Sequence, residues 1–492
     1  FYYSSICDFD FSKIKKIEEY AFAFTKIKEL YIPENLELSD YCFGGSSSLT
    51  TVIFDKNFKG DIPNYSFLNC TSLKELVLSD FTENIGEQAF ANTNINYLQL
   101  PLNLKKLNKY TFNRCRSLET VKIPKDLEEI GIGSFNSCKG LKYVIVDKYA
   151  KLREIKQNAF ADCEKLEIFD FNDNLSIIKS RAFSRTSLKK AKLKNIKELE
   201  DGAFVYCKKL KEVYLSDYLE KIAKSTFQNC SSLEIAHIGK NIEEIQENAF
   251  FKCEKLNEVV FGDKLKIIRK TAFHKCSSLE EINLGDNLET IKYGAFSGCS
   301  SLKKVHLGDS LKIIESQSFL DCLNLEEIHF GKEINSLGSY AFRNTNLKEV
   351  YIPKNITKLD SGCFCSCMNL KKAQVDANVN LLSEYLFYGC INLEELNISE
   401  NIKKLGYRSL CNTGLEMLDL ENIEEIGREA IKHCRNLKEV IIGDKIYDIA
   451  LYNFENCNNL TKIRINSSNM VSRLKGRLYF KNNKDRIVIS KK

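Results

Sequence analysis

The stretch from Ser277 to Cys299, SSLEEINLGDNLETIKYGAFSGC, contains the pattern that the rest of the chain repeats. Its first three apolar residues alternate with polar ones, as in a strand with one buried face, and Gly285-Asp286 is a turn signal. The remaining apolar residues return the chain to the core. This spacing fits neither one long helix nor one long strand, so it predicts one coil of a solenoid. The apolar positions are Leu279, Ile282, Leu284, Leu288, Ile291, Ala295, Phe296 and Cys299.

The Phe of this stretch is one of twenty anchor residues, which follow one another at intervals of 21 to 25 residues, most often 23. From Phe204 to Phe342 the interval is 23 without exception. A fixed period of this length indicates a solenoid, which grows by stacking coils, so 492 residues do not imply several domains. The anchors are Phe22, Phe43, Phe67, Phe90, Phe112, Phe135, Phe160, Phe183, Phe204, Phe227, Phe250, Phe273, Phe296, Phe319, Phe342, Phe364, Phe387, Leu410, Ile431 and Phe454.

A second column lies three residues after the anchor and holds fourteen of the nineteen cysteines. In the other coils Thr or Ser takes this place, as at Thr93 and Ser46. The exchange predicts a small buried slot whose thiol or hydroxyl bonds a nearby backbone carbonyl. A column interrupted by Thr does not pair into disulfides. In the dense cluster Cys363-x-Cys365-x-Cys367, two of the three cysteines occupy repeat positions, so we expect no metal there.

Composition and charge exclude several classes of function. The chain is 43% hydrophobic and 28% charged, as in ordinary soluble proteins, and no apolar run approaches the ~20 residues of a membrane helix. The net charge is +6, but Lys462 to Lys492 contains ten Lys or Arg residues and one acid. The rest of the chain is therefore close to neutral. We expect no nucleic-acid partner, because phosphate binding needs cations clustered on one face.

The repeat stops after residue 466. The segment RLYFKNNKDRIVIS, from Arg477 to Ser490, predicts a β-hairpin around Asn482-Asn483 that caps the stack. We therefore divide the chain into a single solenoid domain of about 20 coils, residues 1–466, and a basic cap, residues 467–492. The charge of the cap is expected to be solvated, and an anchor to an anionic surface is the alternative.

The template L-x-x-V-x-L-[G/P/S/D]-x-x-L-x-x-I-x-x-x-A-F-x-x-C, for example SLETVKIPKDLEEIGIGSFNSC from Ser117 to Cys138, resembles the BspA-like, or treponemal-type, leucine-rich repeat. The resemblance covers roughly residues 6–466. It implies an α/β repeat solenoid, a right-handed arc with a parallel β-sheet on the concave face and short turns or helical turns on the convex face. It also implies an adhesin-like surface protein that binds a protein or glycoprotein, such as a host matrix or cell-surface protein.

In each predicted strand, one residue lies between two buried positions and points into the concave groove. This residue changes from coil to coil, and with strands about 4.8 Å apart some twenty coils make a groove on the order of 100 Å, suited to a macromolecule. Lys190, Lys192 and Lys194 form a secondary basic spot. The main predicted ligand contacts, rich in aromatic and imidazole rings, are Tyr214, His237, Asn283, His306, His329 and Tyr351.

His306 and His329 belong to adjacent coils, and two imidazoles about 5 Å apart are able to hold a metal or to respond to pH. The column offers no third strong ligand. We therefore expect partner contacts here and no metal.

No nucleophile with a base, and no acid-base pair in a closed pocket, emerges from the pattern, so we expect no enzyme, no cofactor and a monomer. Two functions remain: an extracellular or cell-surface binding module, and a cytoplasmic interaction scaffold that uses the same groove. Eight Asn-x-Ser/Thr sequons do not decide between them. A glycan at Asn355 or Asn397 would favour the secreted route.

Overall fold

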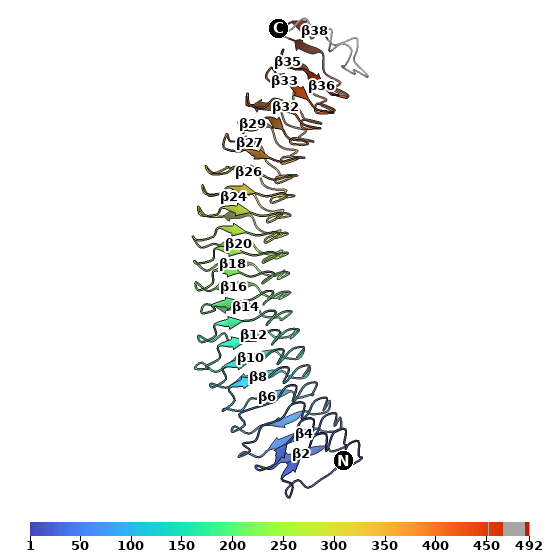
Figure 1. The fold of residues 1–492 in the computed structure, drawn as a ribbon, viewed down its shortest axis with the longest axis vertical. Helices are drawn as coiled ribbons and strands as arrows, with labels where there is room; N and C mark the ends of the chain where they lie inside the picture. Colours follow the sequence, from blue (N-terminus) through green and yellow to red (C-terminus); the bar gives the residue numbers. More distant parts are fainter. Residues whose placement is uncertain (451, 466–487, 492) are drawn as a thin grey trace. The chain divides into compact units, whose positions relative to one another are not determined.

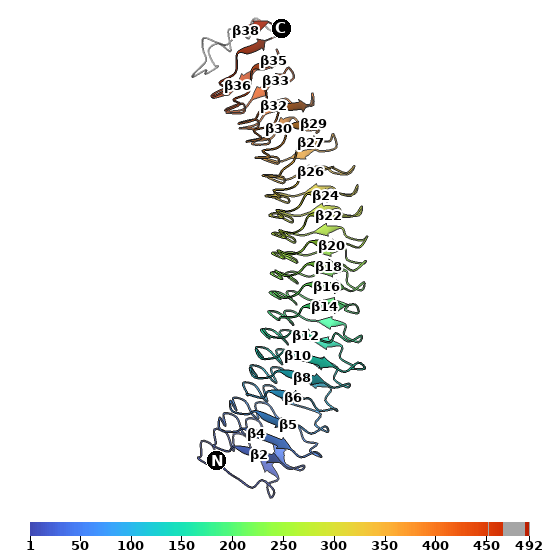
Figure 2. The ribbon, with the colours of Figure 1, turned by 180° about the vertical axis from the view of Figure 1, so that it is seen from behind.

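The computed structural model describes residues 1–450, 452–465 and 488–491. The chain forms two units, an N-terminal unit of Phe1–Ile242 with Lys252–Leu256 and a C-terminal unit of Glu243–Phe251 with Asn257–Lys492. Within each unit, coils stack one on another and present their strands at corresponding positions (Figures 1 and 2). A parallel solenoid of repeated coils is therefore confirmed, whereas the proposed boundary at residue 466 stays a prediction.

The first strand of each coil builds what we call the first ladder, and all its pairings within a unit are parallel. In the N-terminal unit these strands are β2 (Glu29–Ile32), β4 (Thr51–Phe54), β5 (Glu75–Val77), β6 (Tyr97–Gln99), β8 (Thr120–Ile123), β10 (Tyr143–Val146), β12 (Ile168–Phe169), β14 (Lys190–Leu193), β16 (Glu212–Leu215) and β18 (Ile235–His237). In the C-terminal unit they are β20 (Glu258–Val260), β22 (Glu281–Asn283), β24 (Lys304–His306), β27 (Glu349–Ile352), β29 (Lys372–Val375), β31 (Glu395–Ile398), β33 (Met417–Leu420), β35 (Glu439–Ile442), β37 (Lys462–Ile465) and β38 (Val488–Lys491).

A second ladder of two-residue strands forms where the sequence indicated only a return to the core. In the N-terminal unit it contains β1 (Lys16–Ile17), β3 (Glu37–Leu38), β7 (Lys106–Leu107), β9 (Glu129–Ile130), β11 (Glu154–Ile155), β13 (Ile177–Ile178), β15 (Glu198–Leu199) and β17 (Lys221–Ile222). In the C-terminal unit it contains β19 (Glu244–Ile245), β21 (Ile267–Ile268), β23 (Thr290–Ile291), β25 (Ile313–Ile314), β26 (Ser336–Leu337), β28 (Lys358–Leu359), β30 (Leu381–Leu382), β32 (Lys404–Leu405), β34 (Glu425–Ile426) and β36 (Asp448–Ile449).

The core consists of the predicted apolar columns. All eight apolar residues of the stretch 277–299 are buried, and so are all twenty anchors. The ring of Phe296 stacks between its neighbours, with centroid separations of 5.2 Å to Phe273 and 5.3 Å to Phe319 and nearly parallel planes. Because each ring packs against the next coil as well as its own, an anchor buries apolar area that no coil buries alone.

The turn around each anchor is linked to the next coil by backbone hydrogen bonds. The N–H groups of Gly294, Phe296 and Gly298 donate to the carbonyls of Ser316, Ser318 and Leu320, at 3.0, 2.8 and 2.8 Å. Both glycines have positive φ, +60° and +75°, and the same two positions in other coils hold left-handed residues of many types.

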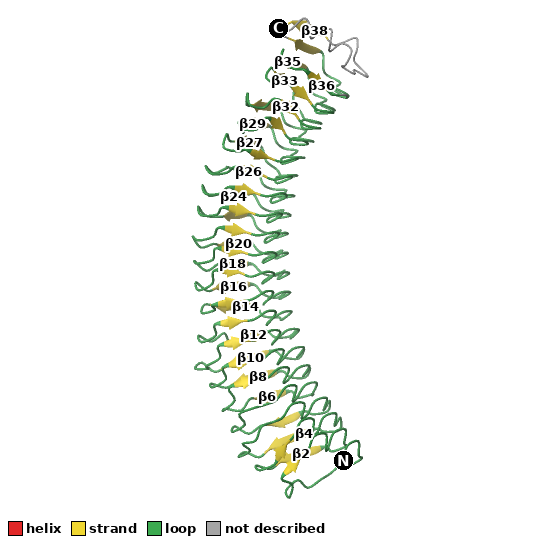
Figure 3. Cartoon of the chain, in the orientation of Figure 1, coloured by secondary structure: helices red, strands yellow, loops and turns green. Residues whose placement is uncertain are grey.

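Left-handed residues on both sides of the anchor prevent the turn from continuing as a right-handed helix. The expected helical turns, and with them the α/β class, are wrong: the described residues contain strands and turns but no helix (Figure 3). It follows that no described helix is long and apolar enough to span a membrane.

The cysteine column behaves as predicted. Each of its fourteen thiols donates to the carbonyl of the anchor in the preceding coil, for example Cys138 to Phe112 at 3.1 Å. Thr93 instead donates to the carbonyl of its own anchor, Phe90, at 3.0 Å. All nineteen cysteines are free thiols. The slot therefore joins adjacent coils without covalent bonds.

The C-terminal cap is described only in part. Most of the predicted hairpin, residues 477–487, lies outside the described residues. The last strand of the cap, β38, pairs in parallel with β37 and so extends the first ladder by one strand.

Candidate ligand-binding surface

Two exposed columns run along the first ladder of each unit. The central column contains the residue predicted from the sequence, such as Tyr351, which is 52% exposed. A flanking column lies two residues earlier, as at Glu349, and it is exposed because alternate residues of a strand share a face. The sequence analysis missed the flanking column, although the same alternation in the sequence predicts it.

In the N-terminal unit, Tyr214 and His237 lie side by side. They are partners in the β16–β18 register, and their rings stack with a centroid separation of 4.3 Å. The phenol of Tyr214 donates to Glu212 at 3.2 Å. Lys190 of β14 forms an ion pair with Glu212 and lies 4.9 Å above the Tyr214 ring. The hydrogen bond with Glu212 raises the pKa of Lys190. One member of the predicted basic spot thus joins the aromatic pair.

In the C-terminal unit, Asn283 and His306 are register partners in β22 and β24. The imidazole Nε2 of His306 lies 2.9 Å from the Glu281 carboxylate in the flanking column. The side-chain oxygen of Asn283 accepts the N–H of Gly285 at 3.1 Å, which leaves its amide nitrogen for a ligand. Glu281 is a neighbour of His306 that the central column alone did not reveal.

His329 lies in a coil whose residues 326–330 form no strand, so no strand pairing places it beside His306. Its side chain is 90% exposed, with Nε2 3.9 Å from Glu327. Tyr351 is in register with Gln374 of β29, and a hydrogen bond with the Asp376 carboxylate raises the pKa of its phenol. Across the described part of the chain, no three His, Cys, Asp or Glu residues are grouped so that they could hold a metal ion.

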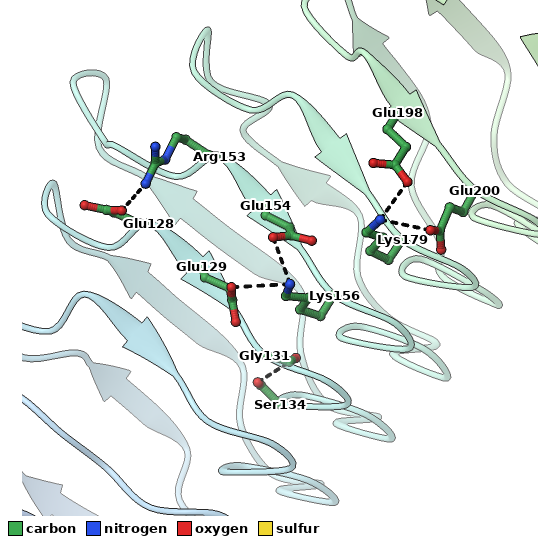
Figure 4. A network of polar contacts seen from close by, with 10 residues as sticks. All are labelled: Glu128, Glu129, Gly131, Ser134, Arg153, Glu154, Lys156, Lys179, Glu198 and Glu200. Carbon is green, nitrogen blue, oxygen red and sulfur yellow. Dashed lines mark hydrogen bonds and ion pairs between the residues drawn. The ribbon is translucent and has the colours of Figure 1, made fainter.

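The outer face of the second ladder carries charges that are already paired. Lys179 lies between Glu198 and Glu200, at 2.6 and 3.0 Å, and Lys156 lies between Glu129 and Glu154, at 3.4 and 2.9 Å (Figure 4). The first ladder carries ion pairs too, but it also presents the exposed Tyr and His rings described above. It is therefore the better candidate surface.

A cleft of about 560 Å³ opens on the first-ladder face of the N-terminal unit, between β12 and β14. Asp170 and Lys192 of the central column both line it. Lys194 lines a smaller neighbouring hollow of about 180 Å³. Two of the three lysines of the predicted basic spot, Lys190 and Lys192, thus border one cleft that also contains acids.

A repeated parallel coil with an exposed, variable strand face is the architecture of leucine-rich repeat proteins. The family described as BspA type leucine rich repeat region matches residues 1–60, 37–151, 147–257, 243–371 and 357–484, in 6 copies, and the chain belongs to this family. No curated protein matches the chain.

Solved structures of three bacterial proteins are similar to the chain at low sequence identity. A leucine-rich repeat protein from Bacteroides ovatus has a TM-score of 0.52 and 20% identity, covering 80% of this chain and 92% of that one. A leucine rich cell surface protein from Faecalibacterium prausnitzii has a TM-score of 0.33 and 17% identity, covering 77% and 90%. The leucine-rich repeat protein of T. pallidum has a TM-score of 0.29 and 24% identity, covering 40% and 78%.

Proposed function

We propose that this chain is a non-catalytic module that binds a protein or glycoprotein through the exposed columns of its first ladder. One observation carries the proposal: the buried columns repeat the same residues from coil to coil, whereas the exposed residues change. Packing does not require that variation, since the side chains concerned point to solvent. Tyr214, His237, His306 and Tyr351 supply apolar area with polar tips, as binding surfaces commonly do.

Membership of the BspA-type family supports an extracellular or cell-surface location and an adhesin-like role. The alternative is an intracellular scaffold that uses the same face. The nineteen free thiols favour that alternative, because secreted proteins with many cysteines usually form disulfides. The two functions differ in the partner, not in the surface.

The test uses the purified protein on wells coated with collagen, fibronectin or laminin, each with and without enzymatic removal of its glycans. The triple variant His306→Ala, His329→Ala and Tyr351→Ala should bind at least tenfold more weakly than the wild type. Its free energy of unfolding should change by no more than about 1 kcal/mol, because these are exposed sites.

A matched control removes three exposed residues from the second-ladder side of the C-terminal unit, Lys266, Tyr293 and Lys312, and should bind normally. Binding that survives glycan removal identifies a protein ligand. Equal binding by the two triple variants would refute the role of the central column, and no binding to any coated well would favour the scaffold.

A further inference from the structure

The first ladder of the N-terminal unit is interrupted between β12 and β14. Within the described residues β12 pairs with β10, β14 pairs with β16, and nothing joins β12 to β14. The same two coils remain in contact elsewhere. Ile178 and Leu199 are register partners in the second ladder, and the anchors Phe160, Phe183 and Phe204 stack at 5.4 and 5.3 Å. The coils therefore separate only on the first-ladder face, where the cleft opens.

Two aromatic residues lie beside this interruption. Phe169 and Phe171 occupy the inward positions that Ile282 and Leu284 hold in the coil 277–299. Their rings lie 5.0 and 5.5 Å from the anchor Phe183 and 4.9 Å from each other. β5 and β6 are also unpaired, although Leu76 and Leu78 occupy the same two positions there, so rings are not needed to interrupt the ladder. Phe169 and Phe171 instead give the cleft an apolar wall.

The same sequence occurs a second time with the same result. Phe9-Asp10-Phe11 repeats the Phe-Asp-Phe order of residues 169–171, and its two rings are also 4.9 Å apart. Residues 9–11 form no strand, the next rung β2 pairs with β4, and a cleft of about 430 Å³ lies between them. Two Phe-Asp-Phe sequences thus each accompany a cleft with an aspartate on its border.

The interruption also separates a charge pair. Asp170 and Lys192 occupy the central column of successive coils, yet neither forms an ion pair within the described residues. Where strands are paired, opposite charges in register meet, as Lys372 and Glu395 of the flanking column do at 3.1 Å. Asp170 and Lys192 both line the cleft. They are available to a ligand with complementary charges.

We propose that the cleft between β12 and β14 binds an extended peptide segment of a partner protein that carries one basic and one acidic side chain. The basic side chain meets Asp170 and the acidic one meets Lys192. The cleft volume lies within the roughly 300–1,000 Å³ of typical ligand sites. This inference rests on the proposed function, because it names the partner chemistry of the same face.

The test selects peptides from a random-sequence display library on the immobilised full chain. Wild type should enrich peptides with Lys or Arg two residues from Asp or Glu, because alternate residues of an extended segment share a face. Asp170→Lys should select acidic peptides, and Lys192→Asp should select basic ones. A synthetic peptide of the wild-type consensus should bind each of these variants at least tenfold more weakly.

A further variant removes the two rings that line the cleft without altering its charges. Phe169→Val with Phe171→Leu restores aliphatic residues of the kind found in other coils, so it should fold, as circular dichroism will show. It should bind the consensus peptide at least tenfold more weakly, because the apolar wall of the cleft is lost. The inference is overturned if wild type enriches no mixed-charge motif, if the charge variants select the same peptides, or if the ring-deleted variant binds as tightly as the wild type. If one of these results is found but the protein still binds the matrix-coated wells, the peptide inference fails and the proposed function stands. The two failures can therefore be distinguished.

Discussion

The thiol of Cys299 donates a hydrogen bond to the carbonyl oxygen of Phe273, one coil earlier, at 3.2 Å. The backbone N–H of the same cysteine donates to the carbonyl of its own anchor, Phe296, at 3.1 Å. The Phe273 carbonyl also accepts the backbone N–H of Cys276, at 3.1 Å, so the thiol supplies its second hydrogen bond and links the two coils. A typical hydrogen bond contributes about 0.5–1.5 kcal/mol, so this small side chain contributes directly to stacking.

Thiol labelling should distinguish one reactive cysteine from all the others. Cys7 is exposed, and the other eighteen cysteines are buried. Burial raises the pKa of thiols such as Cys42 and Cys299 to about 12, which leaves little reactive thiolate. With maleimide, the native protein should take up one label rapidly, and the urea-unfolded protein nineteen. The variant Cys7→Ser should take up none while native, and a rapidly labelled site in it would contradict the buried column.

Stability should fall at alkaline pH because of these thiols. A folded pKa of about 12 for Cys299, above its ordinary value of 9.0, means that the folded state holds this proton more tightly than the unfolded state. The contribution is complete below pH 9 and is lost at about 1.4 kcal/mol per pH unit as pH rises toward 12. Urea midpoints at pH 8 and pH 10 should differ more for the wild type than for Cys299→Thr. Identical pH dependence in the two proteins would argue against this origin.

The anchor stack should be sensitive to truncation. Phe296→Ala removes a buried ring that stacks on both neighbours, and it should lower the free energy of unfolding by about 3–5 kcal/mol. Phe296→Leu should cost less, about 1 kcal/mol of lost stacking, because the buried Leu410 serves as an anchor elsewhere. Urea denaturation measures both. Equal losses for the two variants would mean that ring stacking, not burial, dominates.

A buried carboxylate supports the coils near the C-terminal end, where Leu410 and Ile431 replace the aromatic anchor. Glu429 is only 4% exposed and accepts from Arg408 at 2.6 Å, with Arg428 and Lys432 nearby. Burial alone would raise its pKa, but the Arg408 hydrogen bond and the surrounding cations outweigh burial and lower it. The stability from this group is therefore present above its ordinary pKa of 4.5 and is lost as pH falls.

Replacing that carboxylate should accordingly be costly. Glu429→Ala leaves the partly exposed Arg408 without its carboxylate and Lys432 with only Glu455, and it should lower the free energy of unfolding at pH 7 by about 1.5–3 kcal/mol. Glu425→Ala, which removes an exposed pair with Lys404, should cost no more than about 1 kcal/mol. Urea titrations of both variants at pH 7 and pH 4 make the comparison. The gap between them should narrow at pH 4, and a gap that stays constant would exclude the titration of Glu429 as its source.

Glycosylation in a eukaryotic secretory system should discriminate between two sequons. The amide of Asn355 donates to the carbonyls of Lys332 and Ile334, so a glycan there would break bonds between coils. Asn397 is exposed on β31. Intact-mass analysis should find glycan at Asn397 and none at Asn355. The reverse occupancy would contradict the bonding described for Asn355.

The repeat and its core could be predicted because every coil has the same sequence pattern. Phe296, Cys299 and the leucines recur in the same order, and twenty repetitions remove the ambiguity of a single short apolar run. The turn conformation was harder to predict. Gly294 and Gly298 signal left-handed backbone in one coil, but Tyr340 and Asn344 adopt it in another because the inter-coil hydrogen bonds hold them there.

The candidate site was predicted only in outline. Alternation identified Tyr214 and His306 as exposed strand residues, but Glu212 and Glu281, which bond them, belong to the column that was passed over. The cleft beside Asp170 depends on whether two strands pair, which is a property of two coils together. Comparing one central-column residue from each coil of the sequence does not show whether neighbouring strands pair.

The cysteine-to-anchor bonds connect each coil only with its immediate neighbour. A gene rearrangement that removed or duplicated one whole period would therefore join compatible thiols, carbonyls and rings at the new junction. The buried stack would be preserved while different exposed side chains became adjacent. Bonding restricted to neighbours thus allows the recognition surface to be rearranged in units of one coil, without a new fold having to evolve.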